Sequence, residues 1–390
     1  MKKKLLFLML LVSQVLTAQQ PVWPELTHEN KPWTRWWWPG SIVTKPDLTA
    51  AMSKYRDAGL GGMEIAVIYG VKGQEDRFIK YLSPEWMDMF THVLAEGERL
   101  DLGIELANAS GWPFGGPWVT PADACKNVSY RTWTLAGGDS LNEKIEFIQQ
   151  PLVRPVGERP DITKLKYPIS KNDNLQLYAL DQIRFEKTLP LKVLMAYSDS
   201  GRIADLTGNV TPEGKLVWTA PPGKWTLYGV FQGWHGKMAE RAGPGGEGDV
   251  IDHFSGQAID NYLKHFDSIF KDYDIRSLKG YFNDSYEVDD ASGQSDWTND
   301  LFSEFIIRRG YDLRGHLPAL FQKDDPRKTK ESSPITVRPS PILFWRNSPH
   351  TGRNGLTGRE KPQGTRPTDH RETYLICIQP STSPRPRATN

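Results

Sequence analysis

The sequence predicts an α/β fold: a partial (β/α)8-type barrel with an inserted β-sandwich-like module. Apolar strands alternate with amphipathic helices before residue 130 and again after residue 248, which is typical of a parallel sheet with crossover helices. Between these stretches the segments alternate as strands do and are separated by turns. We therefore divide the chain into 1–18, a signal peptide; 19–130, the first part of the barrel; 131–248, the inserted β-rich module; 249–322, the continuation of the barrel; and 323–390, an irregular tail.

The bulk composition excludes some classes of function. The 390 residues are 38% hydrophobic and 24% charged, and 48 basic and 47 acidic residues give a net charge of +1. A chain with so balanced a charge is not expected to bind nucleic acid or an anionic membrane surface. The 2 cysteines indicate neither a disulfide framework nor a metal knuckle. The 14 Trp and 14 Tyr provide flat rings that stack on sugars, although core packing explains most of them.

The N-terminus has the pattern of a secretion signal. Lys2, Lys3 and Lys4 precede an apolar run, residues 5–12, and small or polar residues lead to Ala18. The run is too short to cross a bilayer. We expect export to the periplasm or the cell surface, with no membrane span after removal of the signal.

The first strands and helices follow in order after the signal. Residues 34–38 form a strand that stops at Pro39-Gly40, and Pro46 opens a helix that Gly59 closes. Residues 62–68 are an apolar strand of the kind found in the middle of a parallel sheet.

A second helix and a third strand continue this alternation. Ser83 is an N-cap with Pro84 at the first helical position, and Trp86, Phe90 and Val93 form an apolar stripe. The strand at residues 103–108 then runs into a loop rich in Gly and Trp, residues 110–118.

The inserted module and the segments after it complete the prediction. The expected strands of the module are residues 191–197, 215–218 and 225–231. After it come a helix at 255–273, a strand at 278–284 and a helix at 298–309. In β/α barrels the loops after the strands carry the chemistry, so we expect the functional residues there.

The tail differs from the rest of the chain. Residues 326–390 hold 10 Pro, 12 Lys or Arg and 4 Asp or Glu, without helical or strand periodicity. One interpretation is a disordered basic tail. The other is a shifted reading frame, since back-translation of residues 333–339 in another frame allows Ser-Asp-Tyr-Arg-Glu-Thr, and residues 368–375 allow His-Gly-Ser-Pro-Gly-Asn-Leu-Phe. We favour the shifted frame.

Carboxylates at the end of the strand at 278–284 are the strongest candidates for catalysis. The run Gly280–Glu287 places Asp284 and Glu287 beside a strand terminus, where burial of an unpaired charge is costly. Glycosidic cleavage needs a proton donor and a second carboxylate. Glu287 suits the donor if its surroundings raise its pKa. The alternative for this segment is a capping or salt-bridged acidic loop.

Two other acidic residues lie in apolar strands. Glu64 and Glu105 are the only charged residues of their runs, and Asn108 and Trp112 follow Glu105. Each Glu could instead pair with an arginine such as Arg35, but two on successive strands favour a polar pocket. Clustered carboxylates and Asn suit a hard cation such as Ca²⁺. A plain hydrogen-bond network explains them equally well, and no paired His spacing indicates zinc.

These motifs together resemble glycoside hydrolase family 106. The resemblance covers about residues 30–322 and rests on residues 36–40, 61–65, 109–112, 115–118, 284–287, 297–298, 310–312 and 317–320. It implies a bacterial α-L-rhamnosidase with a β/α barrel, β-sandwich modules and an inverting mechanism assisted by calcium. It also implies that Glu287 is the general acid and that Glu64, Glu105, Asn108, Trp112 and Asp284 are pocket residues.

The chain departs from the family pattern in its last part. The later family segments, one like Gly-Ser-Pro-Asn and one like Pro-Glu-Thr-Glu that supplies the base, do not occur in the chain as translated. We therefore expect about half a barrel, and an inactive, poorly folded polypeptide. The alternatives are a non-catalytic carbohydrate-binding or surface protein and a retaining glycosidase of another barrel family. For the hydrolase we expect an oligo- or polysaccharide substrate of plant type.

Overall fold

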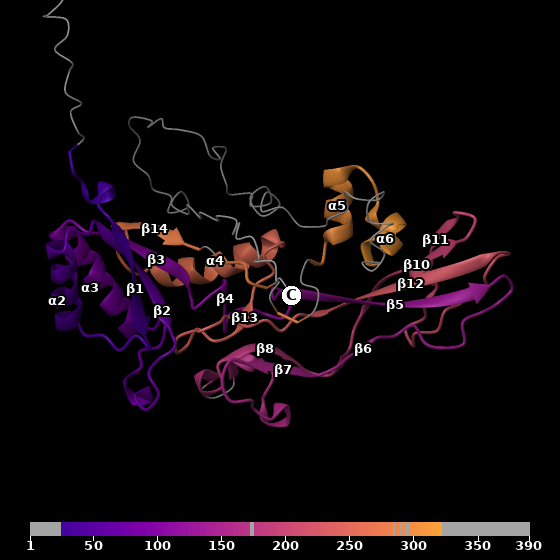
Figure 1. The fold of residues 1–390 in the computed structure, drawn as a ribbon, viewed down its shortest axis with the longest axis horizontal. Coiled ribbons are helices and arrows are strands. Elements are labelled where there is room, and N and C mark those ends of the chain that lie inside the picture. Colours follow the sequence, from indigo (N-terminus) through magenta and orange to yellow (C-terminus); the bar gives the residue numbers. More distant parts are fainter. Residues whose placement is uncertain (1–24, 172–174, 284, 289–290, 293–296, 322–390) are drawn as a thin grey trace, which may run out of the picture.

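A parallel sheet and an antiparallel sheet make up most of the molecule. The computed structural model describes residues 25–171, 175–283, 285–288, 291–292 and 297–321. Figure 1 shows the parallel sheet with its helices at one end of an elongated molecule and the antiparallel sheet at the other. The signal segment at 1–18 and the tail at 323–390 lie outside the described residues.

The parallel sheet confirms the predicted mixed α/β fold. Its strand order is β1-β2-β3-β14, and every neighbouring pair is parallel. The strands are β1 (Trp33–Pro39), β2 (Gly62–Ile68), β3 (Gly103–Ser110) and β14 (Leu278–Phe282). The crossover helices are α2 (Lys45–Asp57), α3 (Pro84–Leu100) and α4 (Gly256–Phe270). Closure of such strands into a barrel remains a prediction.

The helices begin where their capping residues lie. The Ser83 hydroxyl accepts a hydrogen bond from the Trp86 amide at 3.2 Å, and Pro84 is the first residue of α3. The Ser255 hydroxyl caps α4 in the same way, through the Ala258 amide at 3.3 Å. Each cap satisfies an amide that the helix itself leaves without a partner.

Strand β1 has one face toward the helices. Trp36 packs edge-on against Tyr55 of α2 at 5.7 Å between ring centres, and Trp38 lies 5.9 Å from Trp86 of α3. Trp38 and Trp86 are fully buried. Because side chains alternate along a strand, Trp33, Arg35 and Trp37 of β1 point to the opposite face of the sheet.

That opposite face is closed at the amino ends of the strands by one indole. Trp33 is in register with Gly62, which is in register with Gly103. A Cβ added to Gly62 or Gly103 would come within 2.7 or 2.1 Å of the Trp33 ring. Glycine is therefore needed at both positions, because the ring lies directly over their backbone.

The inserted module is built around an antiparallel sheet. Its strand order is β11-β10-β12-β5, with bounds β5 (Lys126–Ala136), β10 (Leu191–Ser198), β11 (Ile203–Asp205) and β12 (Lys224–Trp234). The strand predicted at 215–218 is absent from the described residues, where Leu216 forms only an isolated bridge to Val210. Within the module, the short strands β6 (Ile148–Gln149) and β9 (Lys187–Thr188) pair, as do β7 (Leu152–Pro155) and β8 (Leu180–Arg184). The pair β4 (Gly115–Gly116) and β13 (Asp249–Val250) lies in the segments that flank the module.

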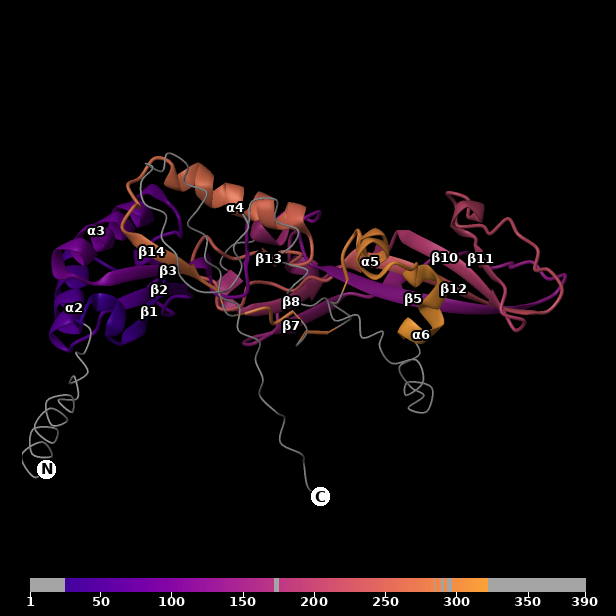
Figure 2. The same ribbon diagram turned by 90° about the horizontal axis from the view of Figure 1, so that it is seen from above.

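The last helices pack on the antiparallel sheet. Helices α5 (Leu301–Arg309) and α6 (Leu317–Phe321) cover apolar side chains of β10 and β12 such as Val193 and Val230. The Tyr197 hydroxyl donates to the Arg314 carbonyl at 2.5 Å. Figure 2 shows both helices beside β10 and β12, whereas α4 lies with the parallel sheet. The predicted segment 249–322 is thus divided between the two sheets.

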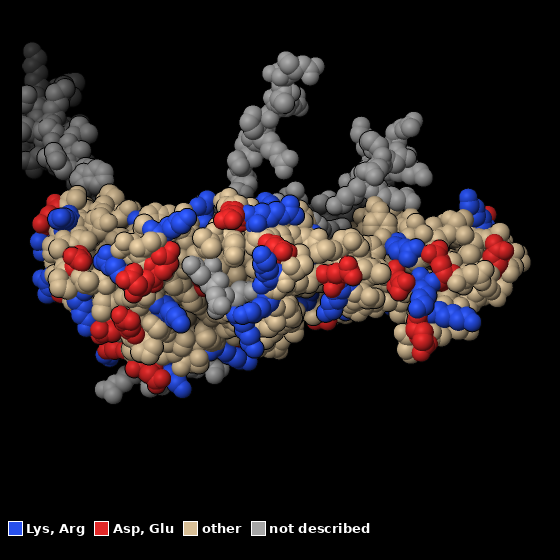
Figure 3. Space-filling view, turned by 90° about the horizontal axis from the view of Figure 1, so that it is seen from below, with Lys and Arg blue, Asp and Glu red and all other residues tan. Residues whose placement is uncertain are grey.

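The surface carries mixed charge. On the face shown in Figure 3, Lys and Arg side chains are interspersed with Asp and Glu side chains. A surface of this kind attracts polyanions weakly. In the described part of the chain, no helix combines the length and the apolar character needed to cross a bilayer.

Candidate functional site

A cavity of about 270 Å³ lies at the carboxyl ends of the parallel strands. Every strand of the parallel sheet contributes to its wall, through β1, β2, β3 and β14 and the loops that follow them. The polar and aromatic residues of its lining include Arg35, Trp37, Glu64, Trp112, Phe282, Asn283, Ser285 and Glu287. In open and closed parallel sheets this edge is where ligands bind.

The strand register brings the charged side chains into one row. Arg35 of β1 pairs with Glu64 of β2, and Glu64 pairs with Glu105 of β3. Paired residues of neighbouring parallel strands point to the same face of the sheet. The row therefore lies on the face away from the helices, one layer above Trp33.

Arg35 and Glu64 form an ion pair in the cavity wall. The Arg35 Nε donates to Glu64 Oε2 at 3.1 Å, and the Glu64 side chain is only 11% exposed. The guanidinium also lies over two rings, 5.3 Å from the centre of Trp37 and 4.9 Å from that of Phe282. Contacts to a carboxylate and to aromatic rings together hold an arginine in one orientation.

Two indoles form an apolar wall beside the ion pair. The ring centres of Trp37 and Trp112 are 6.2 Å apart, and the rings are tilted by 52°. The Trp112 backbone is fixed by a bridge to Glu240, with its amide 3.1 Å from the Glu240 carbonyl. Such rings bind the C–H faces of sugars.

The third part of the site follows β14. The Ser285 hydroxyl donates to Glu287 Oε1 at 3.4 Å, and the Asn283 carboxamide accepts from the Ser285 amide at 3.3 Å. Glu287 has φ +36°, a region that side chains other than glycine rarely adopt. Backbone strain of this kind persists only where surrounding contacts hold the residue in place, and it is concentrated at functional sites.

The predicted site residues fall into three groups. Glu64, Trp112 and Glu287 line the cavity together. Glu105 shares the sheet face of Glu64 but is outside the lining, and burial raises the pKa of its carboxyl above the usual value. Asp284 lies outside the described residues.

Asn108 is nearly fully buried and is not part of the cavity lining. The lining residues of β3 are Ala107 and Ala109. The Asn108 side chain, between them in sequence, points to the opposite face of the sheet. Its carbonyl oxygen accepts from the Tyr262 hydroxyl of α4 at 2.8 Å. Its side-chain Oδ1 is buried without a hydrogen-bond partner among the described residues.

Sequence reasoning missed several of the lining residues. Trp37, Phe282 and Asn283 were not named as site residues, and Arg35 was considered only as a partner for an acid. The alternation along β1 is the signal that could have found Trp37, because it shares a face with Arg35 and not with Trp36 and Trp38.

The glycine-rich loop of the inserted module packs against this end of the sheet. The Gly243 amide donates to the Ser110 hydroxyl at 2.6 Å, and the Tyr81 amide donates to the Pro244 carbonyl at 2.7 Å. A Cβ on Gly246 would lie 2.2 Å from that of Ser110. These glycines therefore permit close packing of the loop on β3.

No metal centre is apparent in the ranges that the structure describes. There, no group of three or more His, Cys, Asp and Glu side chains could hold a metal ion. Asp284, which was expected as a pocket residue, is outside these ranges.

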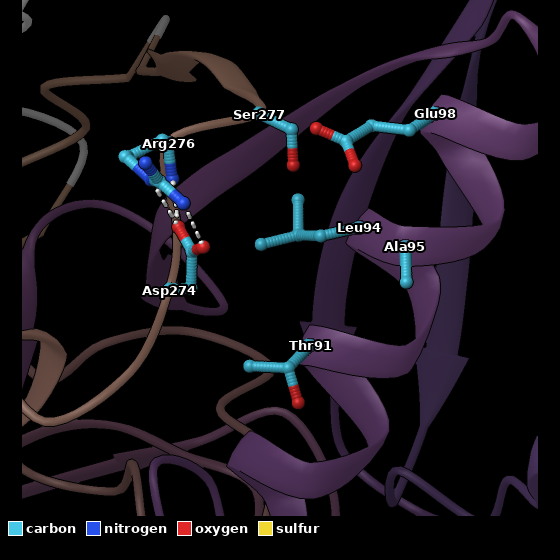
Figure 4. Close-up of a pocket in the computed structure, with 7 residues that line it drawn as sticks. All are labelled: Thr91, Leu94, Ala95, Glu98, Asp274, Arg276 and Ser277. Carbon is cyan, nitrogen blue, oxygen red and sulfur yellow. Dashed lines mark hydrogen bonds and ion pairs between the residues drawn. The ribbon is translucent and has the colours of Figure 1, made fainter.

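Another cavity, of about 550 Å³, lies near the amino ends of the strands. Figure 4 shows residues of α3 facing the loop before β14: Thr91, Leu94, Ala95 and Glu98 opposite Asp274, Arg276 and Ser277. Hydrogen bonds from Arg276 lower the pKa of the Asp274 carboxyl to about 2. This pair is exposed and satisfied, and the opposite end of the sheet carries the other candidate groups. We therefore assign the site to the cavity of about 270 Å³.

Two proteins resemble the chain over most of its length. It is 28% identical over 306 residues to a protein of Formosa agariphila named "Putative beta-glucuronidase", in an alignment covering 75% of this chain and 25% of that protein. Its fold matches the structure of a rhamnosidase from Novosphingobium sp. PP1Y with a TM-score of 0.54 and 19% identity, over 76% of this chain and 42% of that one. The chain thus spans about a quarter of the length of the curated relative.

A family model identifies the relationship more directly. The model described as α-L-rhamnosidase, for glycoside hydrolase family 106, matches residues 25–166 and 186–323. These ranges include the parallel sheet, the antiparallel sheet and the cavity residues. The chain belongs to glycoside hydrolase family 106.

Proposed function

We propose that this chain contributes the sugar pocket and the general acid of an inverting α-L-rhamnosidase. The observation that supports this most is that Glu64 and Glu287, from different strands, line one cavity beside two indoles. An apolar wall with a few fixed polar groups is the usual form of a small-ligand site. Carboxylates accept hydrogen bonds from sugar hydroxyls, and the indoles stack on the ring.

Each site residue has a proposed role. Glu287 protonates the leaving oxygen, which general acids do with an effect of about 10²–10⁴ on rate. Glu64, held by Arg35, accepts hydroxyl donors from the sugar. Trp112 stacks on the ring, while Glu105, Asn108 and Asp284 belong to the surrounding polar shell.

The reaction requires a second carboxylate. In an inverting enzyme it activates water from about 6.5–9.5 Å away on the other face of the sugar. We propose that the chain as translated does not supply this base, and that it therefore binds the sugar without turnover. The family segments that resemble a shifted reading of residues 326–390 are the source we propose for it.

Calcium is part of the proposal. The buried Asn108 Oδ1, which lacks a hydrogen-bond partner among the described residues, is an oxygen donor of the kind that calcium takes. Glu105 lies on the same strand, but alternation along β3 points its half-buried carboxylate to the cavity side of the sheet and the Asn108 side chain to the other side, so the two would not hold one ion. Bound at Asn108, the ion would support the strand behind the cavity and would not contact the sugar.

The cellular location and the substrate are further parts of the proposal. We propose that residues 1–18 direct export to the periplasm or the cell surface, and that the substrate is a plant-type polysaccharide with terminal rhamnose. The name of the Formosa agariphila relative makes an aryl β-glucuronide the comparison substrate.

Two measurements test the function. Calorimetry with L-rhamnose should show binding to the chain as translated and its loss in Trp112→Ala. A single-base change in the codons for residues 324–333, which restores the other frame, should give hydrolysis of an aryl α-L-rhamnoside, with the β-anomer of rhamnose as first product. Glu287→Gln should then abolish turnover and keep binding.

The control is Glu98→Gln, a carboxylate of the other cavity, which should leave turnover unchanged. Binding without turnover in the restored chain would support a non-catalytic carbohydrate-binding protein instead. An α-anomeric first product would indicate a retaining glycosidase.

A further inference from the structure

Arg241 lies outside the cavity lining, in contact with Trp112 of its apolar wall. Its guanidinium carbon is 5.7 Å from the ring centre of Trp112 and 5.9 Å from that of Tyr69. One of its nitrogens, Nη1, donates to the Tyr69 hydroxyl at 3.2 Å. Trp112 is thus shared, because it also lines the cavity and contacts Trp37.

The backbone around Arg241 is fixed on both sides. The Glu240 amide donates to the Trp112 carbonyl at 2.7 Å, and the Tyr69 amide donates to the Arg241 carbonyl at 2.9 Å. Arg241 itself has φ +56°, in the left-handed region. A non-glycine residue held there by contacts from the loops that follow β2 and β3 indicates a side chain whose position matters.

The side chain of Glu240, the residue before Arg241, contributes a second set of contacts that hold this loop. It forms an ion pair with Lys237, whose side chain is fully buried and also pairs with Asp181 at 2.6 Å. Ion pairs of this kind restrict the loop to one arrangement. Arg241 is therefore presented by a rigid support rather than by a free loop.

Among the described residues, no carboxylate forms an ion pair with Arg241, whereas Arg35 in the cavity pairs with Glu64. The side chain is exposed, so most of its donors face solvent. A fixed guanidinium with free donors next to an indole is suited to a planar anion, which it binds through two parallel hydrogen bonds.

We infer that Arg241 and Tyr69 form a subsite for the carboxylate of an acidic sugar, the uronate that neighbours the sugar in the cavity. This inference rests on the proposed function, because it takes the cavity as the rhamnose site. Trp112 links the two positions, so a disaccharide can contact the cavity with one ring and Arg241 with the next. The substrate class is accordingly a rhamnose-capped acidic saccharide.

The test compares two ligands that differ only in the charged group. An α-L-rhamnosyl-uronate disaccharide and its carboxyl-reduced form are titrated by calorimetry into the full chain as translated. We expect the uronate form to bind about 10- to 100-fold more tightly, as for a charge-assisted hydrogen-bonded pair. Arg241→Ala should remove this difference and leave the affinity for the reduced form unchanged.

Arg202→Ala is the matched control, since Arg202 is also exposed and lies 5.1 Å above an indole, that of Trp225 in the antiparallel sheet. It should keep the preference for the uronate. Equal binding of the two disaccharides, or a preference that survives in Arg241→Ala, would overturn the inference and leave the rhamnose site intact. Absence of binding for both would overturn the proposed function and this inference together.

Discussion

The Arg35 guanidinium and the Glu64 carboxylate meet at 3.1 Å between Nε and Oε2, on the face of the sheet away from the helices. Their strands are neighbours in the sheet, and the two residues are direct register partners. The pair therefore fixes a charged group in the wall of a cavity that two indoles also line.

Removal of Arg35 alone should lower the free energy of unfolding more than removal of both charges of the pair. Arg35→Met leaves the Glu64 carboxylate, 11% exposed, without this partner, and should lower the free energy of unfolding by about 1–3 kcal/mol. Arg35→Met with Glu64→Gln should recover part of the loss, because the carboxylate that lost its arginine contact is then a neutral amide. Urea denaturation measures both, and identical losses in the two variants would contradict this account.

Gly111→Ala should disturb the junction between the sheet and the inserted module. Gly111 has φ +70°, and an added Cβ would lie 2.0 Å from the Glu240 carbonyl oxygen. We expect a loss of about 1–3 kcal/mol in the free energy of unfolding. Gly208→Ala is the control, since its Cβ would meet no atom within 4 Å. An equal free energy of unfolding for Gly111→Ala and Gly208→Ala would contradict this prediction, because it would mean that the backbone at Glu240 can move to accept the added Cβ.

Lys237→Met should destabilise the protein strongly. The Lys237 ammonium is fully buried between Asp181, at 2.6 Å, and Glu240. Without it two carboxylates face each other, and we expect a loss of about 3–5 kcal/mol. Thermal or urea unfolding should show almost no change for the exposed Lys224→Met. A small effect of Lys237→Met would mean that water reaches these carboxylates.

The stability of the protein should depend on pH through Asp249. Burial raises the pKa of its carboxyl to about 7, although the Trp234 indole donates to it at 3.1 Å and Lys126 favours the charged form. Its unfolded pKa is about 3.9. The folded state thus holds a proton that the unfolded state has lost, and this stabilising contribution disappears as pH rises from about 4 to about 7.

Asp249→Asn separates this effect from other titrating groups. The wild type should lose stability relative to the variant by up to about 1.4 kcal/mol per pH unit within that window. Denaturation at pH 5, 6 and 7 provides the comparison, and the exposed Asp272→Asn should follow the wild-type curve. A constant difference between wild type and Asp249→Asn would refute the assigned burial effect.

The sequence was sufficient to predict the parallel sheet and its helices. Runs such as Gly62–Ile68 are buried on both faces with a single charged residue, Glu64, and Ser83 and Ser255 mark helix starts by a local hydrogen bond. These features depend on neighbouring residues only, so they can be recognised without knowing the fold. The position of α5 could not be predicted in this way, because the apolar face of a helix does not indicate which sheet it packs against.

The site was predicted in part for the same reason. Glu64 and Glu287 are conspicuous because a charge is rare in an apolar strand or beside its end. Asn108 was expected beside them, but it follows Glu105 by three residues, so alternation along β3 points it to the opposite face from Ala107 and Ala109, which line the cavity.

Arg241 was missed because its neighbours are distant in sequence. Trp112 and Tyr69 precede the antiparallel strands β5, β10 and β12, and Arg241 follows them. The bridge from Trp112 to Glu240 brings these segments together. Only the folded arrangement shows that an exposed arginine contacts Trp112 of the cavity wall.

A crystal structure of the protein with L-rhamnose tests the central claim most directly. We predict the sugar in the cavity at the carboxyl ends of β1, β2, β3 and β14, stacked on Trp112 and within hydrogen-bond distance of Glu64 and Glu287. Rhamnose bound at the cavity beside Leu94 and Asp274, or at no defined position, would contradict the account.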